Sequence, residues 1–140
     1  MKKQVLILCT GNSARSQMAE GFFHAFADDW CDTFSAGTHP SHVHPLAIAA
    51  MAEKHIDISG QRSKSLTEYL AKPFDFVITV CDKAAETCPM FPGSAVRIHW
   101  SFPDPAQAGG SDEEKIQAFR NVRNDMEAII THWLAQQTNP

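Results

Sequence analysis

The stretch CTGNSARS, residues 9–16, decides the fold because it connects a strand pattern directly to a helix pattern. The apolar run VLIL at residues 5–8 precedes it and is typical of a buried parallel strand. After it, apolar residues from Ala19 to Phe26 recur at positions i, i+3, i+4 and i+7, which predicts a helix over residues 15–28. The sequence therefore predicts a strand, a tight polar loop and a helix N-terminus in direct succession.

A loop of this kind favours a tetrahedral anion, because its backbone N–H groups point inward and the helix dipole adds partial positive charge. The planar fork of Arg15 can hold two oxyanion oxygens at once. The same positive field favours a nucleophilic thiolate at Cys9, and Ser16 can donate a hydrogen bond to it. Gly11 and Asn12 suit turns with positive φ. The predicted oxyanion-binding residues are Thr10, Gly11, Asn12, Ser13, Ala14, Arg15 and Ser16.

Composition narrows the class of protein. The 140 residues fit one domain, residues 1–140, and 44% of them are hydrophobic, as in ordinary soluble globular proteins. Twelve basic against 16 acidic residues give a net charge of −4, which argues against a nucleic-acid partner. The apolar runs are too short for a membrane span or a secretory signal, so we expect a cytoplasmic protein that does not bind membranes. Four cysteines then indicate catalysis or redox work rather than structural disulfides.

Strand and helix patterns alternate along the rest of the chain. Further strands are expected at 30–35, 74–80 and 95–100, and helices at 46–55, at 66–70 and after residue 111. This order predicts a single-domain α/β fold with a four-stranded, mainly parallel sheet and helices on both faces. Ligands bind such sheets beyond the carboxyl ends of the strands, and Cys9, Cys81 and Asp104 all fall there.

Two other groups of residues invite a functional interpretation. His39, His42 and His44 lie close together, but no cysteine or carboxylate accompanies them at ligand spacing. Two prolines make this segment a stiff loop, so we predict a solvated loop, with Pro45 opening the next helix and no metal. Cys31 has no partner at a telling spacing and is interpreted as a packing thiol.

The pattern C-x5-R-S with Gly-Asn inside it, near the start of the chain, resembles the low-molecular-weight protein tyrosine phosphatases. The resemblance implies their fold, and it assigns the general acid to Asp104, which precedes Pro105 as in that family. Phosphatases of this fold carry aromatic residues just after the Asp-Pro pair. This chain has Ala106 and Gln107 there, and its single tyrosine is Tyr69.

The segment TVCDKAAETCP, residues 79–89, instead resembles the redox segment of thioredoxin-coupled arsenate reductases, which use the phosphatase fold. The resemblance implies that Cys9 attacks arsenate and that Cys81 then attacks the Cys9 sulfur and releases arsenite. It also implies that Cys88 attacks Cys81 next, which moves the disulfide out of the anion site to where a dithiol partner can reduce it. Two thiols that become a disulfide supply the two electrons, and no cofactor motif is present. Phosphate and sulfate are expected analogues of arsenate, and arsenic resistance is the implied role.

A continuous helix from Cys81 to Cys88 would separate these residues by ~10 Å in rise. A disulfide needs Cβ atoms within about 4.5 Å, so we expect the segment to unwind on oxidation. Some relatives bind potassium through residues that match Asn12, Glu20 and Ser35. Where they place an aspartate, this chain has Lys64, whose ammonium could take the place of the cation, so no metal is predicted.

Three functions remain open at this point. The first is an arsenate reductase that uses thioredoxin or a glutaredoxin-type donor, with a monomer as the expected state. The second is a phosphatase of the same fold. The third is a non-catalytic module that binds anions or senses redox state.

Overall fold

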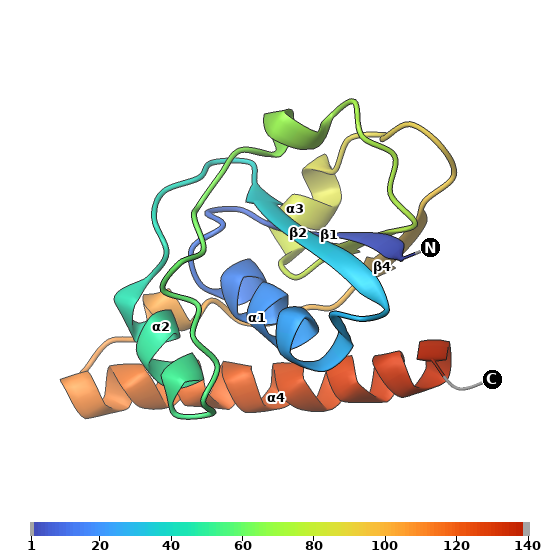
Figure 1. The fold of residues 1–140 in the computed structure, drawn as a ribbon. Helices are drawn as coiled ribbons and strands as arrows, with labels where there is room; N and C mark the ends of the chain where they lie inside the picture. Colours follow the sequence, from blue (N-terminus) through green and yellow to red (C-terminus); the bar gives the residue numbers. More distant parts are fainter. Residues whose placement is uncertain (1, 139–140) are drawn as a thin grey trace.

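The computed structural model describes residues 2–138 and contains a four-stranded, fully parallel sheet (Figure 1). The strand order is β2-β1-β3-β4, so β1 and β3 are central and β4 forms one edge. The predicted fold class is confirmed. The strands are β1 (Lys3–Cys9), β2 (Cys31–Gly37), β3 (Phe76–Thr79) and β4 (Val96–His99).

Helices cover both faces of the sheet, as predicted. Figure 1 shows α1, α2 and α4 on one face and α3 and the short turn η1 on the other. The long final helix begins after Ser111, as predicted, and Ser111 forms a capping box with Glu114. The helices are α1 (Arg15–Ala27), α2 (Pro45–Ala52), α3 (Asp82–Thr87) and α4 (Asp112–Thr138), with 3₁₀ turns η1 (Leu66–Tyr69) and η2 (Pro105–Gln107).

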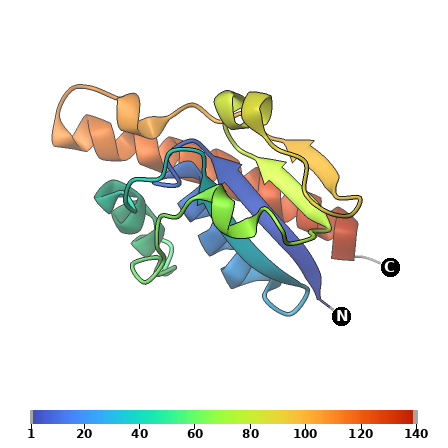
Figure 2. The ribbon, with the colours of Figure 1, turned by 90° about the horizontal axis from the view of Figure 1, so that it is seen from above.

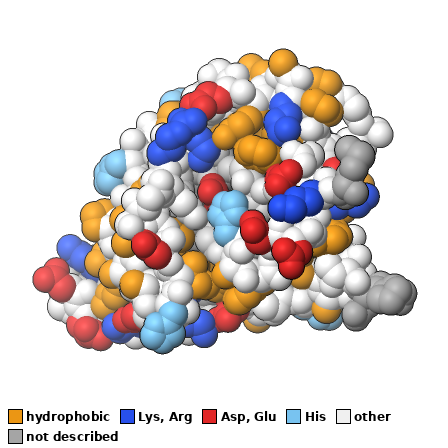
Figure 3. All heavy atoms as spheres, in the orientation of Figure 1, with side chains coloured by type: hydrophobic (Ala, Val, Ile, Leu, Met, Phe, Trp, Pro, Cys, Tyr) orange, Lys and Arg blue, Asp and Glu red, His pale blue; other side chains and the backbone are white. Residues whose placement is uncertain are grey.

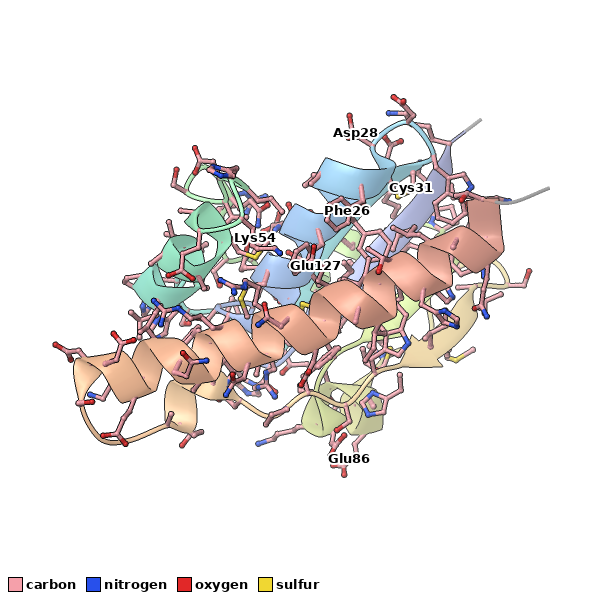
Figure 4. The ribbon with its side chains drawn as sticks, turned by 90° about the horizontal axis from the view of Figure 1, so that it is seen from below. Phe26, Asp28, Cys31, Lys54, Glu86 and Glu127 are labelled. Carbon is pink, nitrogen blue, oxygen red and sulfur yellow. The ribbon has the colours of Figure 1, made fainter. Side chains whose placement is uncertain are left out.

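The core forms where β1 is covered from both sides. Residues 5–9 of β1 are all buried, as expected of a central parallel strand. From α1, Met18, Phe22 and Phe23 pack against the sheet with no exposed surface, and each such side chain contributes about 1.5–3 kcal/mol by its burial. The expectation that the apolar face continues to Phe26 is wrong. This residue is 44% exposed, and its ring stacks on Phe22 at the margin of the core (Figure 4).

Helix α4 lies across α1 and closes the lower face of the molecule (Figure 4). Its end packs through Trp133, whose ring contacts Phe23, Trp30, Phe76 and Trp100. Near its middle α4 contacts α2, because Arg123 Nη1 donates to Ala50 O at 2.8 Å. Figure 4 shows Lys54 and Glu127 facing each other, and their charged groups lie 3.0 Å apart. These contacts hold α1, and the loop before it, against the sheet.

Among residues 2–138 no helix is both long and apolar enough to cross a membrane. Acidic and basic side chains are interspersed on the face shown in Figure 3.

Candidate active site

The predicted loop lies at the carboxyl edge of the sheet, above the central strand. Cys9 is the last residue of β1, and the chain leaves β1 for β2 on one side and later returns as β3 on the other. This change of direction creates the crevice in which parallel α/β sheets bind ligands. Cys81 lies directly before α3, and Asp104 directly before η2. The order of the strands therefore brings three distant parts of the chain to one edge.

The sulfur of Cys9 is surrounded by polar groups although the residue is buried. Its Sγ lies 2.9 Å from Ser16 Oγ, and the backbone N–H of Asn12 donates to it at 3.1 Å. The sulfur therefore lies among hydrogen-bonding groups at the start of α1, where a helix N-terminus favours bound anions. The geometry thus suits Cys9 as a nucleophile.

The side chain of Asn12 holds the loop in shape. It is fully buried, and its Nδ2 donates to Ser16 Oγ at 2.7 Å and to Ser35 Oγ at 3.0 Å. Its Oδ1 accepts the backbone N–H of Lys64 at 3.0 Å. Asn12 has a positive φ of 45°, as predicted, because asparagine tolerates the left-handed region. The same prediction for Gly11 is wrong. Gly11 is not among the glycines with positive φ, and a Cβ there would make only ordinary contacts at 3.7 Å or more.

The sequence analysis missed Gly37, the last residue of β2. A Cβ built there would lie 2.5 Å from Thr10 O and 2.9 Å from Asn12 N, so only glycine allows this strand to approach the loop so closely. A glycine two residues after the strand predicted at 30–35 could have indicated a close approach of backbone segments. The sequence does not show which segment approaches it.

Arg15 and Asp104 face the same pocket. Arg15 Nη1 donates to Phe102 O at 3.1 Å, and Nη2 lies 3.7 Å from Asp104 Oδ2. The other carboxylate oxygen of Asp104 accepts the N–H of Ala106 at 3.0 Å and so fixes the side chain at the start of η2. A guanidinium has five N–H donors, and within the described part of the chain only Phe102 takes one in a hydrogen bond. Arg15 can therefore bind an oxyanion without leaving its anchor.

Two adjoining hollows form the pocket. One, of about 610 Å³, is lined by Cys81, and the other, of about 290 Å³, is lined by Cys9. They share Thr10, Arg15 and Asp104 as walls. The structure therefore brings four of the predicted site residues together, namely Cys9, Arg15, Cys81 and Asp104.

Helix α3 separates Cys81 from Cys88. Cys81 Sγ lies 3.3 Å from Thr10 Oγ1, beside the oxyanion loop. Cys88 follows the last turn of α3 and is half-buried in a separate cavity of about 180 Å³. Burial raises the pKa of the Cys88 thiol, and the nearby Arg97 opposes this rise. All four cysteines are free, so the structure is that of the reduced chain, and Cys88 lies outside the pocket.

Below the loop, Lys64 occupies a buried polar cluster. Its Nζ lies 3.7 Å from Glu20 Oε1 and 3.4 Å from Ser35 Oγ. Burial lowers the pKa of Lys64 and the charge of Glu20 opposes this. Burial would raise the pKa of Glu20, but hydrogen bonds from His24 and Ser35 and the charge of Lys64 lower it overall. The ammonium is thus placed to balance the buried carboxylate.

The histidine loop has no group of three possible metal ligands in the described residues. His39 and His42 are exposed, whereas His44 is partly buried against Phe119 and accepts the N–H of Leu46 at 3.0 Å. His44 is thus the N-cap of α2 rather than a solvated residue, and Pro45 opens that helix as predicted. Cys31 is buried, and burial raises its pKa, as expected of a packing thiol.

Comparisons with known proteins agree with this geometry. Residues 4–139 match the family described as low molecular weight phosphotyrosine protein phosphatase. An arsenate reductase of Halalkalibacterium halodurans is 47% identical over 125 residues, which cover 89% of this chain and 90% of that protein. A solved arsenate reductase in the phosphate-binding state has a TM-score of 0.78 at 34% identity and covers 97% of this chain and 98% of its own. The tyrosine phosphatase amsI of Erwinia amylovora has a TM-score of 0.81 over 99% of this chain and 95% of its own, but at 18% identity it shows the fold alone.

Proposed function

The chain belongs to the low molecular weight phosphotyrosine protein phosphatase family, and we propose that within it the chain is an arsenate reductase that converts arsenate to arsenite. One observation carries the proposal beyond the family. A second thiol, Cys81, lies 3.3 Å from Thr10 Oγ1 on the pocket that Arg15 and Asp104 line. Hydrolysis of a phosphate ester has no use for this thiol, whereas reduction of an oxyanion requires one.

Arsenate resembles phosphate in shape and charge and would bind in the loop of residues 9–16. The backbone N–H groups at the start of α1 and the free donors of Arg15 would hold its oxygens. Within the described residues, Arg15 and Asp104 are the charged groups that line the hollow beside Cys9, whereas Asp82 and Lys83 line only the larger hollow. An anion would therefore meet Arg15 as the main positive charge, with Asp104 able to carry a proton.

In the first step, the Cys9 thiolate attacks arsenic and forms an S–As bond. An arsenate oxygen leaves as water after Asp104 donates a proton to it. The adduct still contains As(V), so no electrons have been transferred. Asp104 suits this role because it lines the same hollow as Cys9 and is fixed by the N–H of Ala106.

In the second step, Cys81 gives up its thiol proton, which ends on the departing arsenite, and attacks the Cys9 sulfur. The Cys9–Cys81 disulfide forms, the S–As bond breaks, and its electron pair stays on arsenic, which becomes As(III) and leaves as arsenite. Two thiol sulfurs are oxidised by one electron each, so the two-electron reduction is balanced without a cofactor. The contact with Thr10 places Cys81 next to the loop for this attack.

In the third step, Cys88 attacks Cys81 and returns Cys9 to its thiolate form. Cys88 begins in a different cavity, so α3, with only six residues, has to unwind for the two sulfurs to meet. The resulting Cys81–Cys88 disulfide would be reduced by thioredoxin in the cytoplasm, with a glutaredoxin-type donor as the alternative. The chain would act as a monomer.

The test is steady arsenite formation by the full chain with arsenate, thioredoxin, thioredoxin reductase and NADPH. We expect one NADPH to be consumed for each arsenite formed. Replacement of thioredoxin by glutaredoxin and glutathione should slow arsenite formation. Absence of arsenite with either donor would refute the proposal.

A phosphatase remains the second candidate, because Cys9, Arg15 and Asp104 are sufficient to hydrolyse an aryl phosphate. Against it stand Ala106, in the 3₁₀ turn after Asp104, and Gln107, which offer no aromatic wall to an aryl substrate. We expect aryl phosphate hydrolysis to be a side activity, which a chromogenic aryl phosphate would measure in parallel.

A further inference from the structure

Two side chains of the edge strand β4 reach the ends of α3. At its start, Asp82 lies 2.8 Å from His99 Nε2, and His99 Nδ1 lies 2.8 Å from Thr79 Oγ1. Beyond its end, the guanidinium of Arg97 donates to Pro89 O and lies 3.4 Å from Met90 Sδ. Figure 2 shows α3 above β3 and β4 at this side of the sheet. β4 therefore contacts the redox segment at the start of α3 and just beyond its end.

Arg97 and Cys88 both contact the same carbonyl oxygen. The Cys88 thiol lies 3.6 Å from Pro89 O, the same carbonyl that accepts from Arg97 Nη2. Both side chains also line the 180 Å³ cavity between α3 and β4. The guanidinium thus lies beside the place where a Cys88 thiolate would form.

Cys88 needs such a cation. Attack on a disulfide requires a thiolate, and burial raises the pKa of this thiol. The charged or titratable groups around it are Arg97 and His99 from β4, with Asp82 held on the far side of His99. On α3 itself, Glu86 is exposed and points away from the sheet (Figure 4). Arg97 is therefore the group that opposes the effect of burial on Cys88.

We propose that Arg97 is a positioning residue for the last thiol exchange, where it holds residues 88–90 beside β4 and stabilises the Cys88 thiolate. This inference rests on the proposed function, because it assigns Arg97 to the third step of that relay. The Cys88 thiol gives its proton to solvent, and its sulfur bonds to Cys81. The Cys9–Cys81 bond breaks, and Cys9 leaves with the electron pair, to be received by the N–H of Asn12.

The experiment compares Arg97→Gln and Arg97→Lys with the unmodified chain, and uses Arg62→Gln as a matched control. Arg62 pairs with Glu68 on the surface, so its loss also removes one exposed arginine side chain. Each reduced chain is alkylated with iodoacetamide across a pH series, and peptide mapping follows each cysteine. In Arg97→Gln we expect Cys88 alkylation at pH 7.5 to slow about tenfold and its midpoint to rise by about one pH unit. In Arg97→Lys the rate and the midpoint of Cys88 alkylation should lie close to those of the unmodified chain. In Arg62→Gln neither quantity should change.

A single turnover then tests the role in the relay. With arsenate alone, Arg97→Gln should release arsenite as fast as the unmodified chain but form the Cys81–Cys88 disulfide about tenfold more slowly. If Cys88 alkylation and disulfide formation are both unchanged in Arg97→Gln, the inference is wrong. Should that variant not fold, Arg97→Met removes the charge and keeps an apolar stem, with the same expectations. The two proposals fail separately, because alkylation reports on Cys88 even if the unmodified chain forms no arsenite.

Discussion

The oxyanion loop and the α3 segment place a reactive thiol at the edge of the same sheet, but the two regions are built in opposite ways. Cys9 is buried in a loop that Asn12, Ser16 and Ser35 fix, with no space at Gly37 for even a methyl group. The segment from Asp82 to Met90 is largely exposed, has one short helix, and is joined to β4 through His99 and Arg97. From this difference we expect a preorganised oxyanion site and a redox segment that rearranges during the proposed relay.

The largest effect should come from the rigid region. In Cys9→Ser the loop keeps its shape, but a hydroxyl stays protonated where a thiol would ionise. Arsenite formation and aryl phosphate hydrolysis should both fall by at least about a thousandfold. Arsenite assays with thioredoxin and a chromogenic phosphate assay measure this. Retention of either activity would mean that a different residue is the nucleophile.

A change in the α3 segment should separate the two activities. Cys88→Ser can still form the Cys9–Cys81 disulfide, so one arsenite per chain should appear in a burst and turnover should then stop. Aryl phosphate hydrolysis, which needs only Cys9, Arg15 and Asp104, should be unchanged. Rapid-quench measurement of arsenite over the first turnovers tests this, and sustained turnover with thioredoxin would show that the electrons leave by another route.

Gly37→Ala tests how rigid the loop is. The added Cβ would lie 2.5 Å from Thr10 O, so we expect a loss of about 2 kcal/mol in the free energy of unfolding and weaker phosphate binding. Gly60→Ala is the matched control, because nothing lies within 4 Å of a Cβ there. Urea unfolding and phosphate titration of both variants provide the comparison. Equal stability of Gly37→Ala and Gly60→Ala would show that the loop moves to accommodate the added methyl group at little cost.

The smallest effect concerns the buried cluster under the loop. The hydrogen bond to Glu20 raises the pKa of His24, partly opposed by burial. Because the folded value lies above the ordinary 6.5, this stabilisation is complete below pH 6.5 and is lost as pH rises through the folded value. His24 is partly exposed, so solvent screening keeps the contribution to about 0.5 kcal/mol or less. Urea unfolding of the unmodified chain and of His24→Gln at pH 6 and pH 9 should converge at the higher pH, whereas a constant difference would contradict this.

The contrast between the regions also explains what the sequence could predict. The strand before Cys9, the loop and α1 follow one another in the chain, so periodicity and turn chemistry predicted them together. Placing Cys81 and Asp104 at the same edge needed only the rule that parallel strands share a carboxyl end. These are local patterns combined with one topological rule.

Pairings between distant segments were not predictable in this way. The approach of Gly37 to the loop and the contacts of Arg97 and His99 with residues 82–90 depend on strand register. The cap formed by His44 was missed because histidine is an uncommon N-cap, although Pro45 signalled a helix start. Phe26 continued the helical period but lies beyond the edge of the core, because periodicity does not say how far the covering layer extends.

The central claim is that Cys9 reacts in a preorganised loop and that the disulfide then passes to Cys81 and Cys88. Its most direct test is peptide mapping of the unmodified chain after one turnover with arsenate and no thioredoxin. The account predicts a Cys81–Cys88 disulfide in amounts equal to the arsenite released, with Cys9 again a free thiol. Arsenite released while Cys81 and Cys88 both remain free thiols would contradict it.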